Sequence, residues 1–440
     1  MKQRRAVAGW LLLATVIAAV GYTFLPDFPK LISGICAWSA GLLLWKDLPR
    51  QARQQVSILL LIGLAGIGWG ATQGIVPDWR MILAGNALLL AMLAAVSFLR
   101  LITRPETEAN ESLPTGRRAV WSTLLGVHLF GAVINLSSVF IMGDRIGKDS
   151  RLNRAQTVVL TRGFSSAAFW SPFFAAMAAA MTYAPGASLP QIWLMGIPLA
   201  TAALLLTALG CRKQQAFIGY PMHPSALALP GLLAVAVLVL HQWHHEWHIL
   251  GVICLLAPSL AIITVAVRRD QPLTRLRQQI EHNLPGMQNE LCLFLAAGVM
   301  AAGLNAVFAG FGDWLPFSHF GGLEATLLLL FMVATSTLGV HPVINIAALG
   351  TLLAPIEPDG TLLAMTFLSA WAIGVASSPF SGINLSMQGR YSQKSLDSLK
   401  WNGLYSLVML LLASIALNLY SEFVLTDPTQ LISGLLPLSQ

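Results

Sequence analysis

The chain has 440 residues, of which 56% are hydrophobic and 10% are charged, whereas a soluble domain carries about 25% charged residues. This composition excludes an ordinary soluble protein, and the lipid bilayer is the expected partner, because apolar runs of about 20 residues can cross a membrane. The formal net charge of +7 is spread over short loops, so we expect no nucleic-acid partner. The four cysteines show no CxxC spacing, and neither a zinc site nor a disulfide framework is indicated.

Eleven membrane-spanning helices are predicted from the apolar runs. The first follows a basic start without a small-residue cleavage site, so residues 1–27 should hold a retained N-terminal transmembrane helix rather than a signal peptide. Two further apolar stretches, 119–142 and 324–355, are interrupted by polar residues and do not fit single spans. The predicted spans lie near 7–25, 29–45, 56–74, 81–99, 156–184, 190–209, 224–241, 248–267, 290–309, 360–388 and 402–424.

The placement of the basic residues predicts the topology, because Lys and Arg collect in cytoplasmic loops. With the N-terminus inside, 23 of the 26 Lys and Arg residues fall on the cytoplasmic side. This count requires that 119–142, which has basic flanks, enters and leaves on the same face as a re-entrant hairpin. We therefore expect a multi-pass protein of a bacterial-type inner (cytoplasmic) membrane, with a cytoplasmic N-terminus and an external C-terminal tail at 426–440.

Two parts of the chain are expected to share one organisation in opposite orientations. Non-helical backbone at membrane depth is allowed where it is buried in protein or lines a wet cavity. The sequence predicts an all-α polytopic membrane protein of about 11 transmembrane helices, with two re-entrant hairpins and two broken helices in an inverted repeat. The first repeat is 28–212, with its hairpin at 119–142 and its broken helix at 156–184, and the second is 213–425, with its hairpin at 324–355 and its broken helix at 360–388.

Ser-Pro pairs interrupt the two broken helices at matching places. Ser171-Pro172 and Ser378-Pro379 lie 207 residues apart. Proline removes a backbone donor and clashes with the preceding turn, so each helix should unwind and free carbonyls and amides. A single Ser-Pro is usually only a packing kink, but two at matching positions indicate a transporter's binding site. The candidate binding residues in these helices are Ser171, Pro172, Ser377, Ser378, Pro379, Ser381 and Asn384.

At the hairpins and the Ser-Pro pairs the sequence resembles the divalent anion/sodium symporter family, within the wider ion transporter superfamily. In that family each hairpin carries a Ser-Asn-Thr motif, and each broken helix carries a Thr-Pro-Pro turn or a similar one. Thr335-Ser336-Thr337 stands where the second hairpin motif is expected. In the first hairpin two registers stay open, Ser122-Thr123-Leu124 and the stretch from Asn135 through Ser137 to Ser138.

The resemblance implies a secondary transporter that forms a homodimer, in which hairpins and broken helices move as a transport domain against a scaffold. The second hairpin lacks the family's asparagine and neither proline is doubled, so a dicarboxylate is not specifically indicated. We expect an elevator-type carrier of a small anion, an organic acid first, with Na⁺ or H⁺ as the coupling ion and no other cofactor.

Few ionisable residues lie in the predicted membrane core, which holds almost no Asp or Glu. Intramembrane carboxylates commonly mark proton relays, so carboxylate-based proton coupling is disfavoured. His128 and His341, 213 residues apart in similar sequence contexts, are interpreted as a repeat-related pair. They are candidates for coupling, or each only hydrogen-bonds a hairpin backbone. Arg162 either pairs with an anionic substrate or extends to the cytoplasmic face.

The segment His241–His248 contains four histidines, with i, i+4 spacings that suit two metal ligands on one helix face. Its tryptophans are typical of the interfacial aromatic belt. We therefore expect an external interfacial turn and assign no metal site.

Three alternatives remain open from the sequence. The fold is compatible with an exporter or antiporter of an inorganic or lipid-linked anion. The chain is also compatible with the large membrane subunit of a binding-protein-dependent carrier, which requires separate partner subunits. A membrane-embedded enzyme needs a nucleophile with a base, metal ligands or paired carboxylates at depth, and since these are not seen we assign no catalytic residue.

Overall fold

The computed structural model describes residues 2–25, 27–102, 112–147, 151–212, 214–222, 228–244, 246–269, 271–311 and 317–426. Within these residues the regular elements are helices, and Thr115 and Ile218 form an isolated bridge between extended segments. The prediction of an all-α polytopic membrane protein is confirmed. The predicted tail, apart from its first residue, lies outside the described residues.

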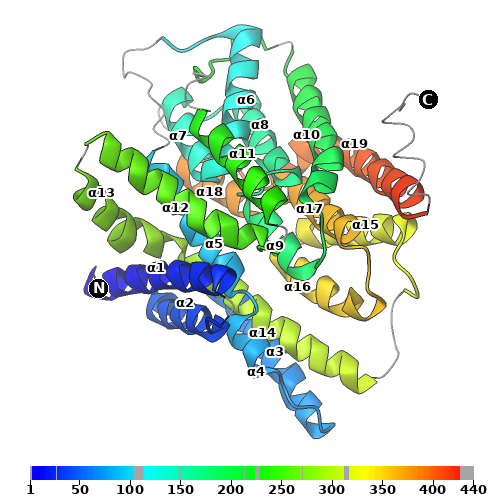
Figure 1. Cartoon of the computed structure of the whole chain (residues 1–440). Coiled ribbons are helices and arrows are strands. Elements are labelled where there is room, and N and C mark those ends of the chain that lie inside the picture. The colour runs from blue at the N-terminus through cyan, green and yellow to red at the C-terminus, as the bar shows by residue number, and fades with distance from the viewer. Residues whose placement is uncertain are drawn as a thin grey trace, which may run out of the picture.

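A first bundle is built from the N-terminal helices and four helices that follow the middle of the chain (Figure 1). α3 packs along α14, α1 lies against α2 and α5, and α12 contacts both α1 and α5, while α11 packs on α12. The helices are α1 (Lys2–Phe24), α2 (Lys30–Leu44), α3 (Arg50–Thr72), α4 (Trp79–Ala84), α5 (Ala87–Ser97), α11 (Ala228–Trp243), α12 (Ile249–Val267), α13 (Pro272–Gln278) and α14 (Gln288–Phe311).

A second bundle surrounds α17, whose residues are all buried. The helices α8, α9, α10, α15, α16 and α19 pack against it, and α16 also contacts α14 and so joins the two bundles. Its helices are α6 (Gly116–Ile134), α7 (Ser137–Ile146), α8 (Arg154–Ser166), α9 (Ala175–Tyr183), α10 (Leu189–Gly210), α15 (Gly322–Thr337), α16 (Pro342–Leu353), α17 (Gly360–Ser377), α18 (Gly382–Tyr391) and α19 (Asp397–Tyr420).

Short 3-10 and π-helical turns extend or join these helices. They are Trp45–Asp47, Phe98–Leu101, Ala167–Phe169, Gln279–Asn283, Leu284–Met287, Ala354–Ile356 and Ser421–Thr426. In the part of the chain that the structure describes, eight helical segments, some of them interrupted by a turn, have the length and apolar composition needed to cross a bilayer. The remaining predicted spans correspond to shorter apolar helices or to helices interrupted by turns, so the expected and observed helix counts agree approximately.

The predicted span 81–99 is interrupted, which its sequence did not indicate. α4 ends at Ala84, and α5 begins at Ala87. Asn86, which lies in the interruption, is buried and its side-chain amide donates to the Phe294 carbonyl at 2.7 Å and to the Tyr183 hydroxyl at 3.1 Å. The break therefore depends on partners far away in the sequence.

Both predicted hairpins are helix–turn–helix elements, and both predicted broken helices are interrupted at their Ser-Pro pairs. α6 and α7 meet at Asn135, which has a φ of 53°, and α15 and α16 meet around Gly339, which has a φ of +105°. α8 and α9 are separated by residues 167–174, and α17 and α18 by residues 378–381. Ser122 and Thr123 lie within α6, so the turn of the first hairpin follows the Asn135 register.

Glycines set the close packing of α3 against α14. A Cβ at Gly66 would lie 2.5 Å from the Gly303 carbonyl oxygen, and a Cβ at Gly303 would lie 2.2 Å from that of Gly63. These distances leave no room for a side chain, so the two helix backbones approach as they do in small-residue membrane interfaces. Gly68, in contrast, has no atom within 4 Å of its Cβ position.

Gly303→Ala should lower the stability of the protein by about 1–3 kcal/mol, because the added methyl forces α3 and α14 apart. Gly68→Ala is the matched control and should be neutral or slightly stabilising, since alanine is the better helix former. Thermal unfolding of the purified variants, followed by tryptophan fluorescence, measures both. Equal melting temperatures for the two variants would contradict this account of the packing.

Candidate functional site

In the first broken helix, Ser171 connects the break to the first hairpin. Its hydroxyl donates to the Ala132 carbonyl at 2.5 Å, and its oxygen accepts from the Phe173 amide at 3.2 Å. Ala132 lies in the last turn of α6, where helical carbonyls lack intrahelical partners. Ser171 is fully buried, so its hydroxyl provides the hydrogen bond that water would otherwise supply.

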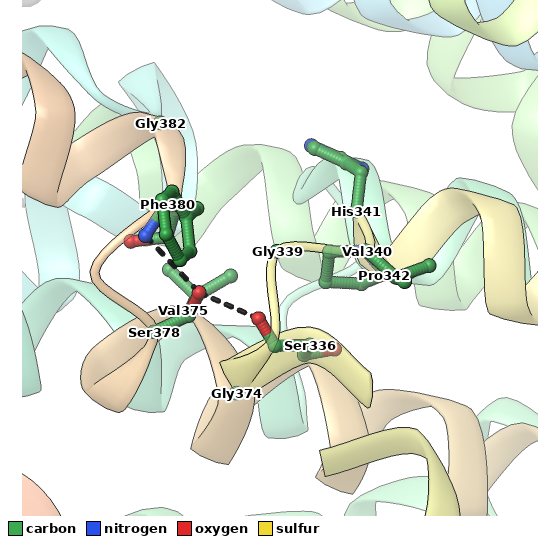
Figure 2. Close-up of a pocket in the computed structure, with 11 residues that line it drawn as sticks. Ser336, Gly339, Val340, His341, Pro342, Gly374, Val375, Ser378, Phe380 and Gly382 are labelled. Atoms are coloured by element: carbon green, nitrogen blue, oxygen red, sulfur yellow. Dashed lines mark hydrogen bonds between the residues drawn. The ribbon is translucent and has the colours of Figure 1, made fainter. Parts of the chain in front are cut away.

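The second broken helix repeats this contact. The Ser378 hydroxyl donates to the Ser336 carbonyl at 2.6 Å and accepts from the Phe380 amide at 3.3 Å, and the serine is 3% exposed (Figure 2). Ser336 lies in the last turn of α15. Both acceptor carbonyls stand three residues before a left-handed turn residue, Asn135 in one hairpin and Gly339 in the other. Each Ser-Pro-Phe segment thus binds a hairpin at the same place.

A pocket of about 280 Å³, open to its surroundings, lies between the second hairpin and the second break. Eleven residues line it, drawn from 336–342 at the hairpin and 374–382 at the break. In Figure 2 the turn from Gly339 to Pro342 faces the segment from Ser378 to Gly382 across this space. That volume includes open space at the mouth, and the part that a water-sized sphere can occupy is about 20 Å³. The pocket in this structure is therefore much smaller than ligand sites, which begin at about 300 Å³.

Gly339 allows the hairpin turn to approach the break. Its φ of +105° is strained for other residues, and a Cβ there would lie 3.2 Å from the Phe380 ring. Gly374 lies on the opposite wall, where a Cβ would be 3.0 Å from the Ser336 Cβ. Small residues therefore hold α15 close to α17 beside the pocket.

The Asn384 side chain, which belongs to α18, donates hydrogen bonds to carbonyl groups at the C-terminal end of α17 on the other side of the break. Its side-chain amide donates to the Ser378 carbonyl at 2.9 Å and to the Ala376 carbonyl at 3.3 Å, while the Ser381 hydroxyl caps α18 by accepting from the Asn384 amide. Pro379, in the unwound segment, is buried. These residues hold the two half-helices in register around the gap.

Aromatic side chains fill the corresponding space in the first half. Phe173 and Phe174, which follow Pro172, are 2% exposed, and Phe174 packs on Phe164 with ring centroids 5.0 Å apart. Trp170 contacts Trp193. The first break is consequently packed, whereas the second is open.

The structure brings only some of the predicted binding residues to the pocket. Ser336, Ser378, Ser381 and His341 line it. The hydroxyls of Thr335, Thr337 and Ser377 donate to carbonyls of their own helices. In the first hairpin, the Ser138 hydroxyl donates to the Asn135 carbonyl, the Asn135 amide donates to Phe173, and Ser137 begins α7.

The two histidines do not occupy equivalent places, although their sequence contexts are similar. His128 lies within α6, seven residues before the turn at Asn135, whereas His341 follows Gly339 and caps α16. The turns lie 204 residues apart and the histidines 213. Their interpretation as a repeat-related pair is therefore wrong, because the letters align but the elements do not.

Each histidine has its own structural partners. His128 is buried, with Nδ1 2.9 Å from the Ser166 hydroxyl and Nε2 accepting from the Trp170 indole at 3.0 Å. His341 accepts the Val343 amide on Nδ1 at 3.2 Å. An accepting ring nitrogen carries no proton, so both bonds fit a neutral imidazole.

Arg162 does not reach the pocket. Its guanidinium donates to Asn402 Oδ1 and to the Trp401 carbonyl, both at 2.7 Å, and lies 4.3 Å from the centre of the Tyr405 ring. These partners belong to α19, so Arg162 connects α8 to α19. The sequence could not indicate this, since the partners lie about 240 residues away.

A charged clasp connects the first hairpin to α18. Arg390 donates to both carboxylate oxygens of Asp144, at 2.8 and 2.5 Å, and the Tyr391 hydroxyl donates to Asp144 Oδ1 at 2.8 Å. Arg390 also lies over the Phe140 ring. A bidentate pair of this kind fixes orientation as well as distance.

In the histidine-rich turn, His244 pairs with Glu246 at 3.0 Å and stacks on Trp247. His245 lies outside the described residues. Within the described ranges no three metal-ligating side chains come together.

Several pocket residues were missed as site candidates. A signal was present, because a glycine follows the polar turn of the second hairpin and a phenylalanine follows each Ser-Pro pair, but these residues were not assigned to the site. The missed residues are Gly339, Val340, Pro342, Gly374, Val375, Phe380 and Gly382.

The helices, the two hairpins and the pocket between a hairpin and a broken helix define a multi-pass helical membrane protein. Among solved structures, the chain is similar to the crystal structure of the Alcanivorax borkumensis YdaH transporter, with 12% identity and a TM-score of 0.51. The similarity covers 84% of this chain and 98% of that one. At this identity it shows the fold alone, and it does not single out the divalent anion/sodium symporter family.

No family model matches the chain, and no curated protein matches it.

Ser171→Ala and Ser378→Ala should each destabilise the protein by about 0.5–1.5 kcal/mol, because each removes a buried hydrogen bond between a break and a hairpin. Ser377→Ala is the matched control, since its hydroxyl bonds only to its own helix, and its cost should be smaller. Denaturation of the purified variants in detergent measures the difference. If Ser377→Ala were as costly as Ser378→Ala, the contact with the hairpin would have no special role.

Proposed function

We propose that the protein is a secondary active transporter of a small anion, an organic acid, which it moves by an elevator-type alternating-access mechanism coupled to Na⁺ or H⁺. The observation that carries this proposal is the pocket between the second hairpin and the second broken helix. Half-helix N-termini favour anionic groups, and unwound carbonyls and hydroxyls suit Na⁺. The transporter fold of the chain supports the same conclusion.

The division into two bundles supports the proposed movement. The second bundle holds both hairpins and both broken helices, while the first holds long helices with glycine-mediated packing. The second bundle would move as the transport domain, and the first would serve as scaffold in a homodimer. This arrangement follows what the divalent anion/sodium symporter family implies.

The experiment that tests the function is thermal stabilisation of the purified protein by a panel of organic and inorganic anions, each in Na⁺, K⁺ or choline. A ligand that binds only the folded state raises its stability by mass action, by about 2.7 kcal/mol at 100 times its Kd. We expect an organic acid to stabilise the protein, and more strongly in Na⁺. Stabilisation by inorganic anions alone would contradict the organic-acid proposal.

Ser336→Ala should weaken this stabilisation and lower uptake into proteoliposomes, with an affinity loss of about five- to tenfold for one hydrogen bond. Stability without ligand should not fall, because the Ser336 hydroxyl has no partner among the described groups and leaving it buried is itself costly. Thr337→Val is the control, since that hydroxyl bonds to its own helix. An unchanged affinity in Ser336→Ala would place the binding site elsewhere.

The proposed location is a bacterial-type cytoplasmic membrane with the N-terminus inside. In a Cys36→Ser background, Arg151→Cys should react with a membrane-impermeant thiol reagent only from the cytoplasmic side, and Val76→Cys, at an 84% exposed position, only from outside. Labelling of intact and opened cells or vesicles distinguishes the two faces. External labelling at Arg151→Cys would exclude a first hairpin that enters from the cytoplasm.

A further inference from the structure

The carbonyl groups that the two helix ends contribute to the pocket already have hydrogen-bond donors. The Ser336 carbonyl accepts from the Gly339 amide and the Ser378 hydroxyl. The Gly374 carbonyl accepts from the Ser378 amide at 2.8 Å, and that of Val375 accepts from Asn384 at 3.4 Å. The negative ends of α15 and α17 are therefore largely neutralised within the protein.

Donors at the same pocket remain available. Within the described residues, the backbone N–H groups of His341 and Gly382 make no hydrogen bond. Ser336 lines the pocket, is 2% exposed, and its hydroxyl has no partner in the described part of the chain. A buried hydroxyl without a partner is costly unless a ligand supplies one.

Two helix N-termini meet at this pocket. α16 begins at Pro342 and α18 begins at Gly382, on opposite sides of the space in Figure 2. Each N-terminus carries about half a positive elementary charge, so together they balance about one negative charge. The lining residues include no Lys, Arg, Asp or Glu.

Two arginines of the second bundle are engaged away from the pocket. Arg390, at the far end of α18, pairs with Asp144, and Arg162 is held by α19. Neither lines the pocket. A second negative charge on a ligand would therefore find no cationic side chain on the pocket wall.

We propose that the pocket selects a monoanion, a short monocarboxylate whose charged group lies between the N-termini of α16 and α18 and whose apolar part contacts Val340 and Phe380. This inference rests on the proposed function and specifies the charge of its substrate. The carboxylate would accept hydrogen bonds from the Gly382 and His341 amides and from the Ser336 hydroxyl. A dicarboxylate of the same length would bind more weakly.

The test is titration calorimetry on the purified full-length protein at neutral pH, where carboxylic acids are ionised, in saturating Na⁺. The probes are butyrate, succinate and butyramide, which share a four-carbon chain and carry one, two and no negative charges. We expect butyrate to bind at least about tenfold more tightly than either of the others. Acetate and malonate provide a second matched pair.

Two substitutions at Val340 test whether the charge of the pocket wall sets the preference for one negative charge over two. Val340→Lys adds a positive charge at the pocket wall and should shift the preference toward succinate, whereas Val340→Met adds similar bulk without charge and should keep the preference for butyrate. Both variants should first show an unchanged melting temperature without ligand.

Three results decide the matter. Butyrate preference that Val340→Lys reverses and Val340→Met retains would support the inference. Succinate binding as tight as butyrate in the unmodified protein would overturn it and leave the proposed organic-anion transport intact. Binding of none of the carboxylates would overturn the proposed function itself, and the inference with it.

Discussion

A helix that is interrupted within an apolar bundle exposes amides and carbonyls that water cannot reach, and the rest of this structure depends on how these groups are bonded. Each interrupted helix lies beside the turn of a hairpin. Another helix ends at that turn, and its last carbonyls also lack hydrogen-bond partners. A serine from one element then serves the carbonyl of the other, Ser171 for Ala132 and Ser378 for Ser336. The unsatisfied ends of two elements thus become partners.

The same local contact has different surroundings in the two halves. In the first half, bulky aromatic side chains occupy the space beside the break, and Phe173 is buried. In the second half Phe380, the corresponding residue, is 45% exposed and borders the pocket. One break is therefore packed, while the other borders a small open pocket with unpaired backbone amides. The functional proposal rests on the pocket of the second half. The packed first half contributes structure and no binding site to this proposal.

Local chemistry was predictable from the sequence, and long-range contacts were not. Proline at 172 and 379 interrupts a helix wherever it occurs, so both breaks could be located from the letters alone. The interruption at Asn86 could not, because its partner is a carbonyl at residue 294. Arg162 likewise depends on Asn402 in α19. The prediction that the two histidines are a repeat-related pair was wrong, because similar flanking residues do not show where each histidine lies relative to the hairpin turn.

The clasp between Asp144 and Arg390 has a mechanical consequence, because it lies at one end of α18 and the pocket lies at the other. A helix of ten residues is about 15 Å long and nearly rigid. If the first hairpin shifted with the ion pair intact, Asp144 would carry Arg390 with it, and the free amide of Gly382 at the opposite end would move as well. The pair therefore provides a physical connection between the first hairpin and the donors of the pocket.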